Sequence, residues 1–298
     1  MSKYRVGVDV GGTKTEAVLI DSEDKTLWRE RVLTNREKGA DHIQNNISAL
    51  INRIFNETDI TPASLTGIGI GLPGSVDPIS GKMINGNTTC LIDADIKAYL
   101  HHKLDFSPEL IFTANDANCF ALAEARMGVG KNFDKNAVGI GIIIGTGCGG
   151  GLTIGQNIFE GSRGGALEVG HTNLVPEGDP CYCGSKGCAE LYLSGKGVEN
   201  TYFRNYGEKK YATEILADKE HRYLYQNYLL QFLKNLTNLF DPDYFVFGGG
   251  LSKDEDLYKS LEKKLESTQF LKGKPGPKLL KNQLGDSAGV FGAAFLSL

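Results

Sequence analysis

The chain has 298 residues, of which 41% are hydrophobic and 23% charged, and its formal net charge is −4. This length and balance fit one large or two medium globular domains and exclude a disordered or fibrous chain. A slightly negative chain has no basic field to hold nucleic acid or an anionic membrane, so we expect neither as a partner.

The N-terminus lacks the pattern of a secretory signal, because Met1 to Arg5 lead straight into a strand-like run. No apolar stretch approaches the ~18 residues that a membrane helix requires. We therefore expect a soluble, cytoplasmic protein, in which the six cysteines are unlikely to form disulfides.

A strand, a glycine-rich turn and a second strand are predicted at the start of each half of the chain. The predicted strands are residues 4–10, 16–20, 139–144 and 151–154. When the two strand–turn–strand segments are aligned without gaps, Gly7 aligns with Gly141 and Gly11 with Gly145. This match predicts a duplicated fold, although glycine turns between apolar strands are common in any case.

Further strand and helix patterns follow one another along the chain. Strands are predicted at residues 27–33, 67–71, 110–113 and 244–247, and helices at 41–54, 116–127, 190–203, 219–239, 254–265 and 287–298. The last helix is apolar on most faces and must be buried. We expect a small α/β domain of residues 1–114, completed by the C-terminal helix 286–298, and a larger α/β domain of residues 115–285.

Three glycine runs are candidates for nucleotide binding. Consecutive backbone N–H groups in such a turn can face one anion, and a carboxylate beside phosphates needs a cation between them, which favours Mg²⁺ near Asp9. A single turn of this kind is more simply a plain hairpin, but three of them favour one nucleotide site. The candidate residues are Asp9, Gly11, Gly12, Thr13, Lys14, Gly145, Thr146, Gly147, Gly248, Gly249 and Gly250.

A cysteine-rich loop suggests a metal centre. Three cysteines lie within eight residues of a polar, glycine-containing loop, and a histidine precedes them. Three thiolates and an imidazole suit a closed structural zinc site; the alternatives are buried free thiols or a transient disulfide. The candidate ligands are His171, Cys181, Cys183 and Cys188, while Cys90, Cys119 and Cys148 are interpreted as packing residues.

Asn115 and Asp116 lie where a predicted strand gives way to a helix, the edge at which open α/β sheets bind ligands. From spacing alone, the simpler interpretation is an N-cap followed by a first-turn carboxylate that interacts with the helix dipole.

Several of these segments carry a family resemblance. Asp9–Lys14, Gly145–Gly151 and Asp241–Gly250 resemble the phosphate and adenosine elements of the sugar kinase/actin superfamily. Glu168 to His171, together with the cysteine loop, is similar to the signature of the ROK family (repressors, open reading frames and kinases). The resemblance covers nearly the whole chain. It implies an actin-like ATPase (ribonuclease H-like) α/β fold with two domains and a cleft between them, ATP and Mg²⁺ as cofactors, structural Zn²⁺, and a homodimer.

The resemblance also implies roles for individual residues. Asp116 corresponds to the general base for the terminal 6-hydroxyl of a hexose, and Asn115 to a residue that holds a neighbouring hydroxyl. The same correspondence predicts that Glu168, His171 and Glu190 bind sugar hydroxyls, that Gly74 and Asn87 lie on the sugar side, and that His171, Cys181, Cys183 and Cys188 bind the zinc.

The identity of the sugar is predicted less directly. Gly74–Gly81 and Asn85–Leu91 resemble the fructokinase/mannokinase branch, whereas Asn115–Glu124 and Glu190–Gly197 resemble bacterial N-acetylglucosamine kinases just as well. Typical ROK glucokinases carry a proline and a tryptophan around the position of Asn87, and neither is present around that position in this sequence. We expect an ATP-dependent hexose kinase for fructose or mannose, with glucose less favoured and N-acetylglucosamine as the alternative.

Two other functions are compatible with the fold. A sugar-responsive ROK regulator is disfavoured because no helix-turn-helix segment precedes the first strand in this sequence, and because Asp116 is present. A kinase for a non-sugar acceptor is disfavoured by Glu168, Glu190 and the cysteine loop.

Overall fold

The computed structural model describes residues 4–86 and 88–298. The chain divides into two compact units. Unit 1 comprises Met1–Ala123, Glu160–Ala166 and Ser287–Leu298, and unit 2 comprises Glu124–Phe159 and Leu167–Asp286. The division into domains at residue 114 stays a prediction.

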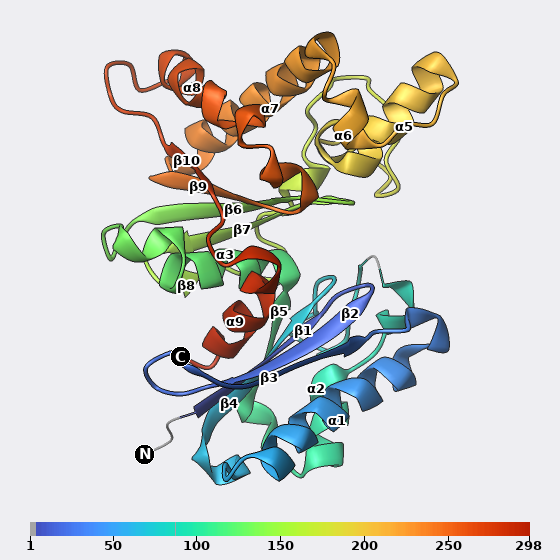
Figure 1. Ribbon diagram of the computed structural model, residues 1–298, viewed down its shortest axis with the longest axis vertical. Helices are drawn as coiled ribbons and strands as arrows, with labels where there is room; N and C mark the ends of the chain where they lie inside the picture. Colours follow the sequence, from blue (N-terminus) through green and yellow to red (C-terminus); the bar gives the residue numbers. More distant parts are fainter. Residues whose placement is uncertain (1–3, 87) are drawn as a thin grey trace. The chain divides into compact units, whose positions relative to one another are not determined.

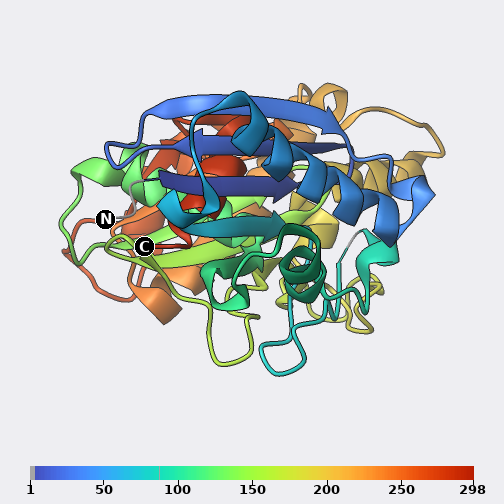
Figure 2. The same cartoon turned by 90° about the horizontal axis from the view of Figure 1, so that it is seen from below.

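Unit 1 is built on a five-stranded sheet in the order β3-β2-β1-β4-β5. The strands are β1 (Tyr4–Val10), β2 (Lys14–Ile20), β3 (Thr26–Leu33), β4 (Leu65–Leu72) and β5 (Ile111–Asn115). One face is covered by α1 (Ala40–Glu57) and α2 (Ile96–Leu104), and the other by α9 (Ala288–Phe295), as Figures 1 and 2 show. The face toward α1 forms a largely apolar core with the buried isoleucines of that helix, which recur at helical spacing.

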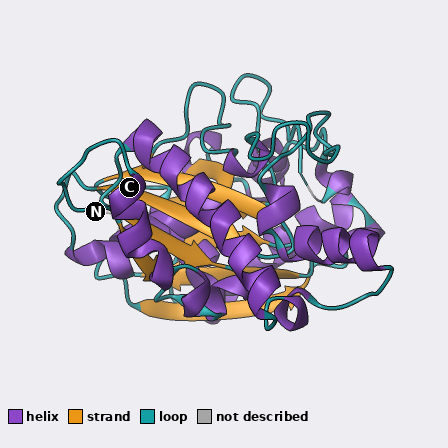
Figure 3. Ribbon diagram, turned by 90° about the horizontal axis from the view of Figure 1, so that it is seen from above, coloured by secondary structure: helices purple, strands orange, loops and turns teal. Residues whose placement is uncertain are grey.

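Unit 2 contains a second five-stranded sheet, in the order β10-β9-β6-β7-β8. Its strands are β6 (Val138–Ile144), β7 (Cys148–Ile154), β8 (Asn157–Ile158), β9 (Tyr244–Gly248) and β10 (Lys278–Lys281). Its helices are α4 (Glu190–Leu193), α5 (Gly195–Tyr206), α6 (Ala212–Ile215), α7 (Lys219–Phe240) and α8 (Glu262–Thr268). Figures 1 and 3 show α7 and α8 over one face of this sheet.

The predicted duplication is confirmed at the level of topology. Reading outward from β1 and from β6, both sheets have the same strand order, and both begin with an antiparallel hairpin followed by a parallel neighbour. The two hairpins differ by one residue at the turn, because Val10 pairs with Thr15 whereas Ile144 pairs with Cys148. The first turn is therefore one residue longer than the second.

Several predicted elements need correction. The helix predicted at residues 190–203 is broken at Ser194, which ends α4 and caps α5 by accepting a hydrogen bond from the Gly197 N–H. The helix predicted at residues 254–265 is instead two short 3-10 turns before α8. Helix α2 and strand β10 were not predicted. Within the described residues, no helix is long and apolar enough to cross a membrane.

The position of α9 depends on glycines in β1 and β4. A Cβ on Gly7 would lie 2.2 Å from the carbonyl oxygen of Val290, and one on Gly69 would lie 1.8 Å from that of Ala293. Neither position has room for a side chain, so the helix backbone lies directly on the strands. These glycines therefore allow the backbones of β1 and β4 to lie close to that of α9, as their occurrence inside strands predicts.

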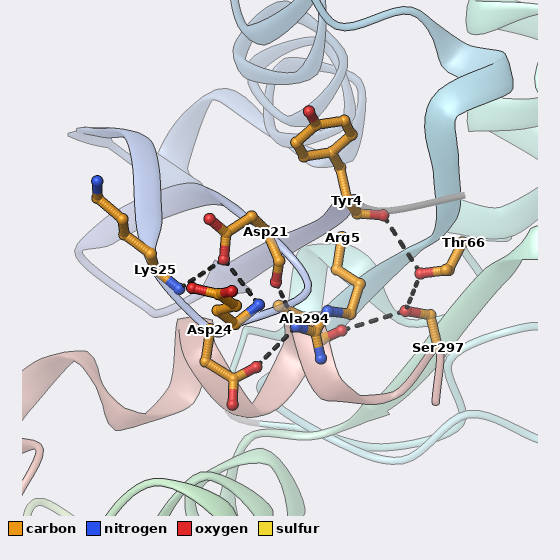
Figure 4. Close-up of polar contacts among 9 residues, drawn as sticks. Tyr4, Arg5, Asp21, Asp24, Lys25, Thr66, Ala294 and Ser297 are labelled. Atoms are coloured by element: carbon orange, nitrogen blue, oxygen red, sulfur yellow. Dashed lines mark hydrogen bonds and ion pairs between the residues drawn. The ribbon is translucent and has the colours of Figure 1, made fainter. Parts of the chain in front are cut away.

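Polar contacts fix the end of the same helix to the sheet (Figure 4). The Thr66 hydroxyl contacts the Tyr4 carbonyl oxygen at 3.3 Å and the Ser297 hydroxyl at 3.2 Å. Arg5 of β1 is buried and pairs with Asp24 at 2.7 Å. Ser297, which follows α9, is thus tied to β4 by a hydrogen bond.

Helix α3 (Asp116–Arg126) carries a fully buried glutamate, Glu124. Its carboxylate accepts hydrogen bonds from the backbone N–H groups of Val129 at 3.1 Å, Gln283 at 3.0 Å and Leu284 at 2.9 Å. A buried carboxylate is tolerated when backbone donors satisfy it. Glu124 therefore joins the C-terminal part of α3 to the segment that follows β10.

Replacing Gly69 with alanine is expected to lower the free energy of unfolding by about 3 kcal/mol, because the new methyl group collides with backbone that cannot rotate away. Chemical denaturation of wild type and variant measures the change. Gly165→Ala in the same unit is the control, since its Cβ would meet nothing within 4 Å. Equal stability of the two variants would contradict the role given to Gly69.

Candidate active site

The first glycine turn joins β1 to β2 and is braced from the end of β3. The Gly11 N–H donates to the Lys14 carbonyl oxygen at 2.9 Å, which closes the turn. The buried Thr34 donates its hydroxyl to the Gly11 carbonyl oxygen at 2.7 Å and its N–H to that of Thr13 at 2.9 Å. Because these carbonyl oxygens accept hydrogen bonds within the protein, the turn is held in one shape. Gly12, Thr13 and Lys14 are exposed and could contact a ligand. Sequence reasoning missed Thr34.

Asp9, at the end of β1, lies among other carboxylates. Its pKa is raised to about 7, first by burial and then by the negative charges of Asp116 and Glu16, while Arg31 opposes the shift. Glu16 is already neutralised by Arg29 at 2.5 Å and Arg31 at 2.6 Å. A divalent cation beside Asp9 would stabilise its ionised form, which fits the expected Mg²⁺.

Asn115 ends β5 and Asp116 begins α3, as the sequence predicts. The Ala117 N–H donates to Asn115 Oδ1 at 2.9 Å and to Asp116 Oδ1 at 2.7 Å. The capping interpretation of these residues is therefore confirmed. It does not oppose a chemical role, because a carboxylate oriented by a helix start is held in one place.

The neighbourhood of Gly74 is tightly packed. A Cβ at this position would lie 2.0 Å from the Asn85 carbonyl oxygen, and the Ser75 N–H donates to Asn85 Oδ1 at 2.7 Å. Gly74 is therefore a residue of close backbone approach. Asn87, the other residue expected on the sugar side, lies outside the described residues.

In unit 2 the other two glycine runs lie together. The second turn is closed by the Gly145 N–H donating to the Gly147 carbonyl oxygen at 2.9 Å, and Thr146 between them is exposed. A Cβ on Gly249 would lie 2.5 Å from the Ile144 carbonyl oxygen and 3.0 Å from the Gly145 nitrogen. The run Gly248–Gly250 thus packs against the turn, as expected if both contact one nucleotide.

Glu190, at the start of α4, is held by the same turn. Its Oε2 accepts a hydrogen bond from the Cys148 N–H at 2.9 Å. The Cys148 side chain is buried, in line with its interpretation as a packing residue, but its backbone has the further task of orienting Glu190. This link between the second glycine turn and a predicted sugar-binding carboxylate was not predicted.

The four predicted metal ligands converge. The ligand atoms of His171, Cys181, Cys183 and Cys188 all lie within 4.8 Å of one another. Cys181 Sγ is 3.7 Å from His171 Nδ1, and Cys183 Sγ is 3.6 Å from Cys188 Sγ. Tetrahedral zinc with Zn–S bonds of about 2.3 Å places its ligand atoms about 3.8 Å apart. The donor set and its spacing therefore fit a structural Zn²⁺.

The thiols of this cluster differ in acidity. The pKa of Cys183 is lowered to about 7, chiefly by a hydrogen bond from the Ser185 N–H, whereas burial raises the pKa of Cys188 to about 12. Zinc binds thiolates, so its binding must release the Cys188 proton.

His171 ends a short 3-10 helix, Val169–His171, which follows directly on Glu168. Leu167 has a positive φ of 64°, an unfavourable conformation for a residue other than glycine, and it immediately precedes the exposed Glu168. The ring of His171 contacts Tyr182, whose Oη lies 3.0 Å from Nε2. Sequence reasoning missed this contact of Tyr182, which stands between two of the predicted metal ligands, Cys181 and Cys183.

Comparisons with known proteins identify the family of the chain. The model of the ROK family matches residues 5–298, so the chain belongs to the ROK family. Its fold is the actin-like ATPase fold of the ROK sugar kinases. A curated relative, the N-acetyl-D-glucosamine kinase of Photobacterium profundum, is 35% identical over 314 residues, which cover 98% of each chain.

Two solved structures are also similar. The ROK hexokinase from Thermus thermophilus has a TM-score of 0.84 and 27% identity, over 98% of this chain and 97% of that one. A ROK family glucokinase from Streptomyces griseus, in complex with glucose and AMPPNP, has a TM-score of 0.73 and 28% identity, over 98% of each chain.

Purified protein is expected to contain about one zinc ion per chain, measured by plasma mass spectrometry, and Cys183→Ala is expected to lose it because one of four ligands is removed. Cys183 is exposed, so its replacement leaves no cavity in a core. Cys90→Ala is the control, as a cysteine outside the cluster. Full zinc content in Cys183→Ala would contradict the proposed ligand set.

Proposed function

We propose that this protein is an ATP-dependent sugar kinase that phosphorylates the 6-hydroxyl of N-acetyl-D-glucosamine. The observation that carries the proposal is similarity over the full chain, at 35% identity, to a curated kinase of that name. The glycine turns, the carboxylate at the start of α3 and the Cys/His cluster support it, since each has a role in such a reaction.

The residues divide the task as follows. Asp116 accepts the hydroxyl proton as the phosphoryl group arrives, and Asn115 holds a neighbouring hydroxyl. Glu168, His171 and Glu190 bind further sugar hydroxyls, for which carboxylate oxygens are good acceptors. The backbone of the three glycine runs, with Thr13 and Lys14, binds the nucleotide. When bound near Asp9, Mg²⁺ supplies positive charge to the phosphates.

The proposed zinc has a structural role. Glu190 lies two residues after Cys188. Glu168 immediately precedes the short helix Val169–His171, which His171 ends. A metal that joins His171 to the cysteines would therefore fix the backbone positions from which the side chains of Glu168 and Glu190 extend. We expect the protein to act as a cytoplasmic homodimer on a small-molecule substrate, and these points stay predictions.

The choice of sugar differs from the first expectation. The names of the curated relatives do not confirm a preference for fructose or mannose, and they favour the alternative, N-acetylglucosamine. Fructose and mannose stay second candidates because Gly74–Gly81 and Asn85–Leu91 resemble that branch.

The substrate is tested by measuring kcat/KM with Mg-ATP for N-acetylglucosamine, fructose, mannose and glucose, using zinc-loaded protein. We expect N-acetylglucosamine to exceed the others at least about tenfold, a difference of 1.4 kcal/mol in transition-state binding. A higher value for fructose or mannose would reverse the assignment, and no turnover of any sugar would contradict a sugar kinase.

Asp116→Asn is expected to lower kcat by about 10²–10⁴-fold, because the amide cannot accept the proton. Sugar affinity, measured by calorimetry, should change little, since the amide has nearly the same shape. Asp59→Asn, at an exposed carboxylate that follows α1, is the matched control. Undiminished turnover in Asp116→Asn would remove this residue from the role of base.

A further inference from the structure

Leu167 has a backbone conformation that its own side chain disfavours. Its φ of 64° lies in the left-handed region, where a Cβ crowds the following carbonyl group. Seven described residues other than glycine have a positive φ, and six of them are aspartate, asparagine or glutamate. Leu167 is the only aliphatic residue in this group, and just 8% of its surface is exposed. Such a conformation persists only where the surrounding structure enforces it, and it often accompanies function.

The strained residue opens a tight turn with Glu168 at its centre. The Val169 N–H donates to the Leu167 carbonyl oxygen at 2.6 Å, and Glu168 has a φ of −65° and a ψ of 52°. A hydrogen bond between residues two apart, with these angles at the middle residue, is an inverse γ-turn. Leu167 and Val169 are buried, whereas Glu168 is exposed. The turn thus buries both neighbours of the carboxylate and leaves the carboxylate itself accessible.

The start of β7 leaves this turn little room to adjust. A Cβ on Gly150 would lie 2.6 Å from Val169 Cγ2. A Cβ on Gly170 would lie 2.0 Å from the Cys148 carbonyl oxygen. The N–H of the same cysteine donates to Glu190, the other carboxylate proposed for the sugar in unit 2. The first residues of β7 therefore support both carboxylates, one through close packing and one through a hydrogen bond.

We propose that Leu167 is a positioning residue, whose left-handed backbone directs Glu168 toward the sugar. Rotation of its φ into the ordinary negative range would redirect the chain immediately before the carboxylate, and the packing on β7 opposes any compensating shift. The inference rests on the proposed function, in which Glu168 binds sugar hydroxyls. It adds a residue that touches neither sugar nor nucleotide and acts through its neighbour.

Two substitutions separate the backbone conformation of Leu167 from the packing of its side chain. Leu167→Gly removes the side chain but adopts a positive φ without strain. Leu167→Val keeps most of the apolar side chain, but its branched Cβ disfavours that φ. With zinc-loaded protein and Mg-ATP, we expect Leu167→Gly to keep the KM and the calorimetric Kd for N-acetylglucosamine within about threefold of wild type. Leu167→Val should raise both about tenfold, or 1.4 kcal/mol in binding free energy.

A control and a second background make the comparison specific. Leu216 is another buried leucine of unit 2, but it has an ordinary φ of −77°, so Leu216→Val should bind the sugar as wild type does. In a Glu168→Ala background, Leu167→Val should cause no further loss of sugar affinity, because its effect passes through the missing carboxylate.

The outcomes separate this proposal from the one it rests on. A tenfold loss in Leu167→Gly would assign the residue to packing and overturn the proposal, even if Leu167→Val did not fold. Loss of zinc from Leu167→Val, or a further loss of affinity in the Glu168→Ala background, would also overturn it. Wild-type preference for another sugar would overturn only the choice of N-acetylglucosamine, and the same comparison on that sugar decides the role of Leu167. Wild-type protein that turns over no sugar would overturn both.

Discussion

The convergence of one imidazole and three thiols within 4.8 Å is the constraint on which the candidate sugar site of unit 2 depends. The loop reaches this geometry through its backbone. Gly187 has a φ of 66°, and a Cβ on it would lie 1.8 Å from the Val175 carbonyl oxygen. The Leu174 N–H donates to the Gly187 carbonyl oxygen at 2.7 Å, which holds the two ends of the loop together. Tyr182 and Glu190 lie on or just after this loop, so the loop backbone determines where their side chains start.

In unit 1, the negatively charged side chains of Asp116 and Glu16 act on Asp9. Burial, and then the negative charges of Asp116 and Glu16, raise the pKa of Asp9 to about 7, and Glu16 itself pairs with two arginines. Carboxylates gathered at the end of a sheet are costly unless a cation joins them. A nucleotide that brings its own metal ion would relieve this repulsion, so charge, as well as shape, favours the metal-bound nucleotide over the free one.

Much of this could be predicted from the sequence because the informative signals are local. Glycine turns, the Cys/His spacing and the change from strand to helix at Asn115 each lie within a few residues, and the structure places them as expected. Individual hydrogen bonds between distant segments could not be predicted. The hydrogen bond from Cys148 to Glu190 joins residues 42 positions apart, and Glu124 receives its donors from residues 159 and 160 positions away. Short or broken helices such as α4 were missed because a serine cap inside a helical pattern gives a weak signal.

The order of segments in unit 1 has a consequence for how the protein is made. Its strands come from Met1–Ala123, but the helix that covers their glycine face comes from Ser287–Leu298, after all of unit 2. On a ribosome, the sheet of unit 1 therefore emerges with one apolar face bare and must wait for the synthesis of unit 2 before that face is covered. A nascent chain in this state exposes surface that chaperones recognise, whereas unit 2 can be completed sooner. The first unit to be started is thus the last to be finished.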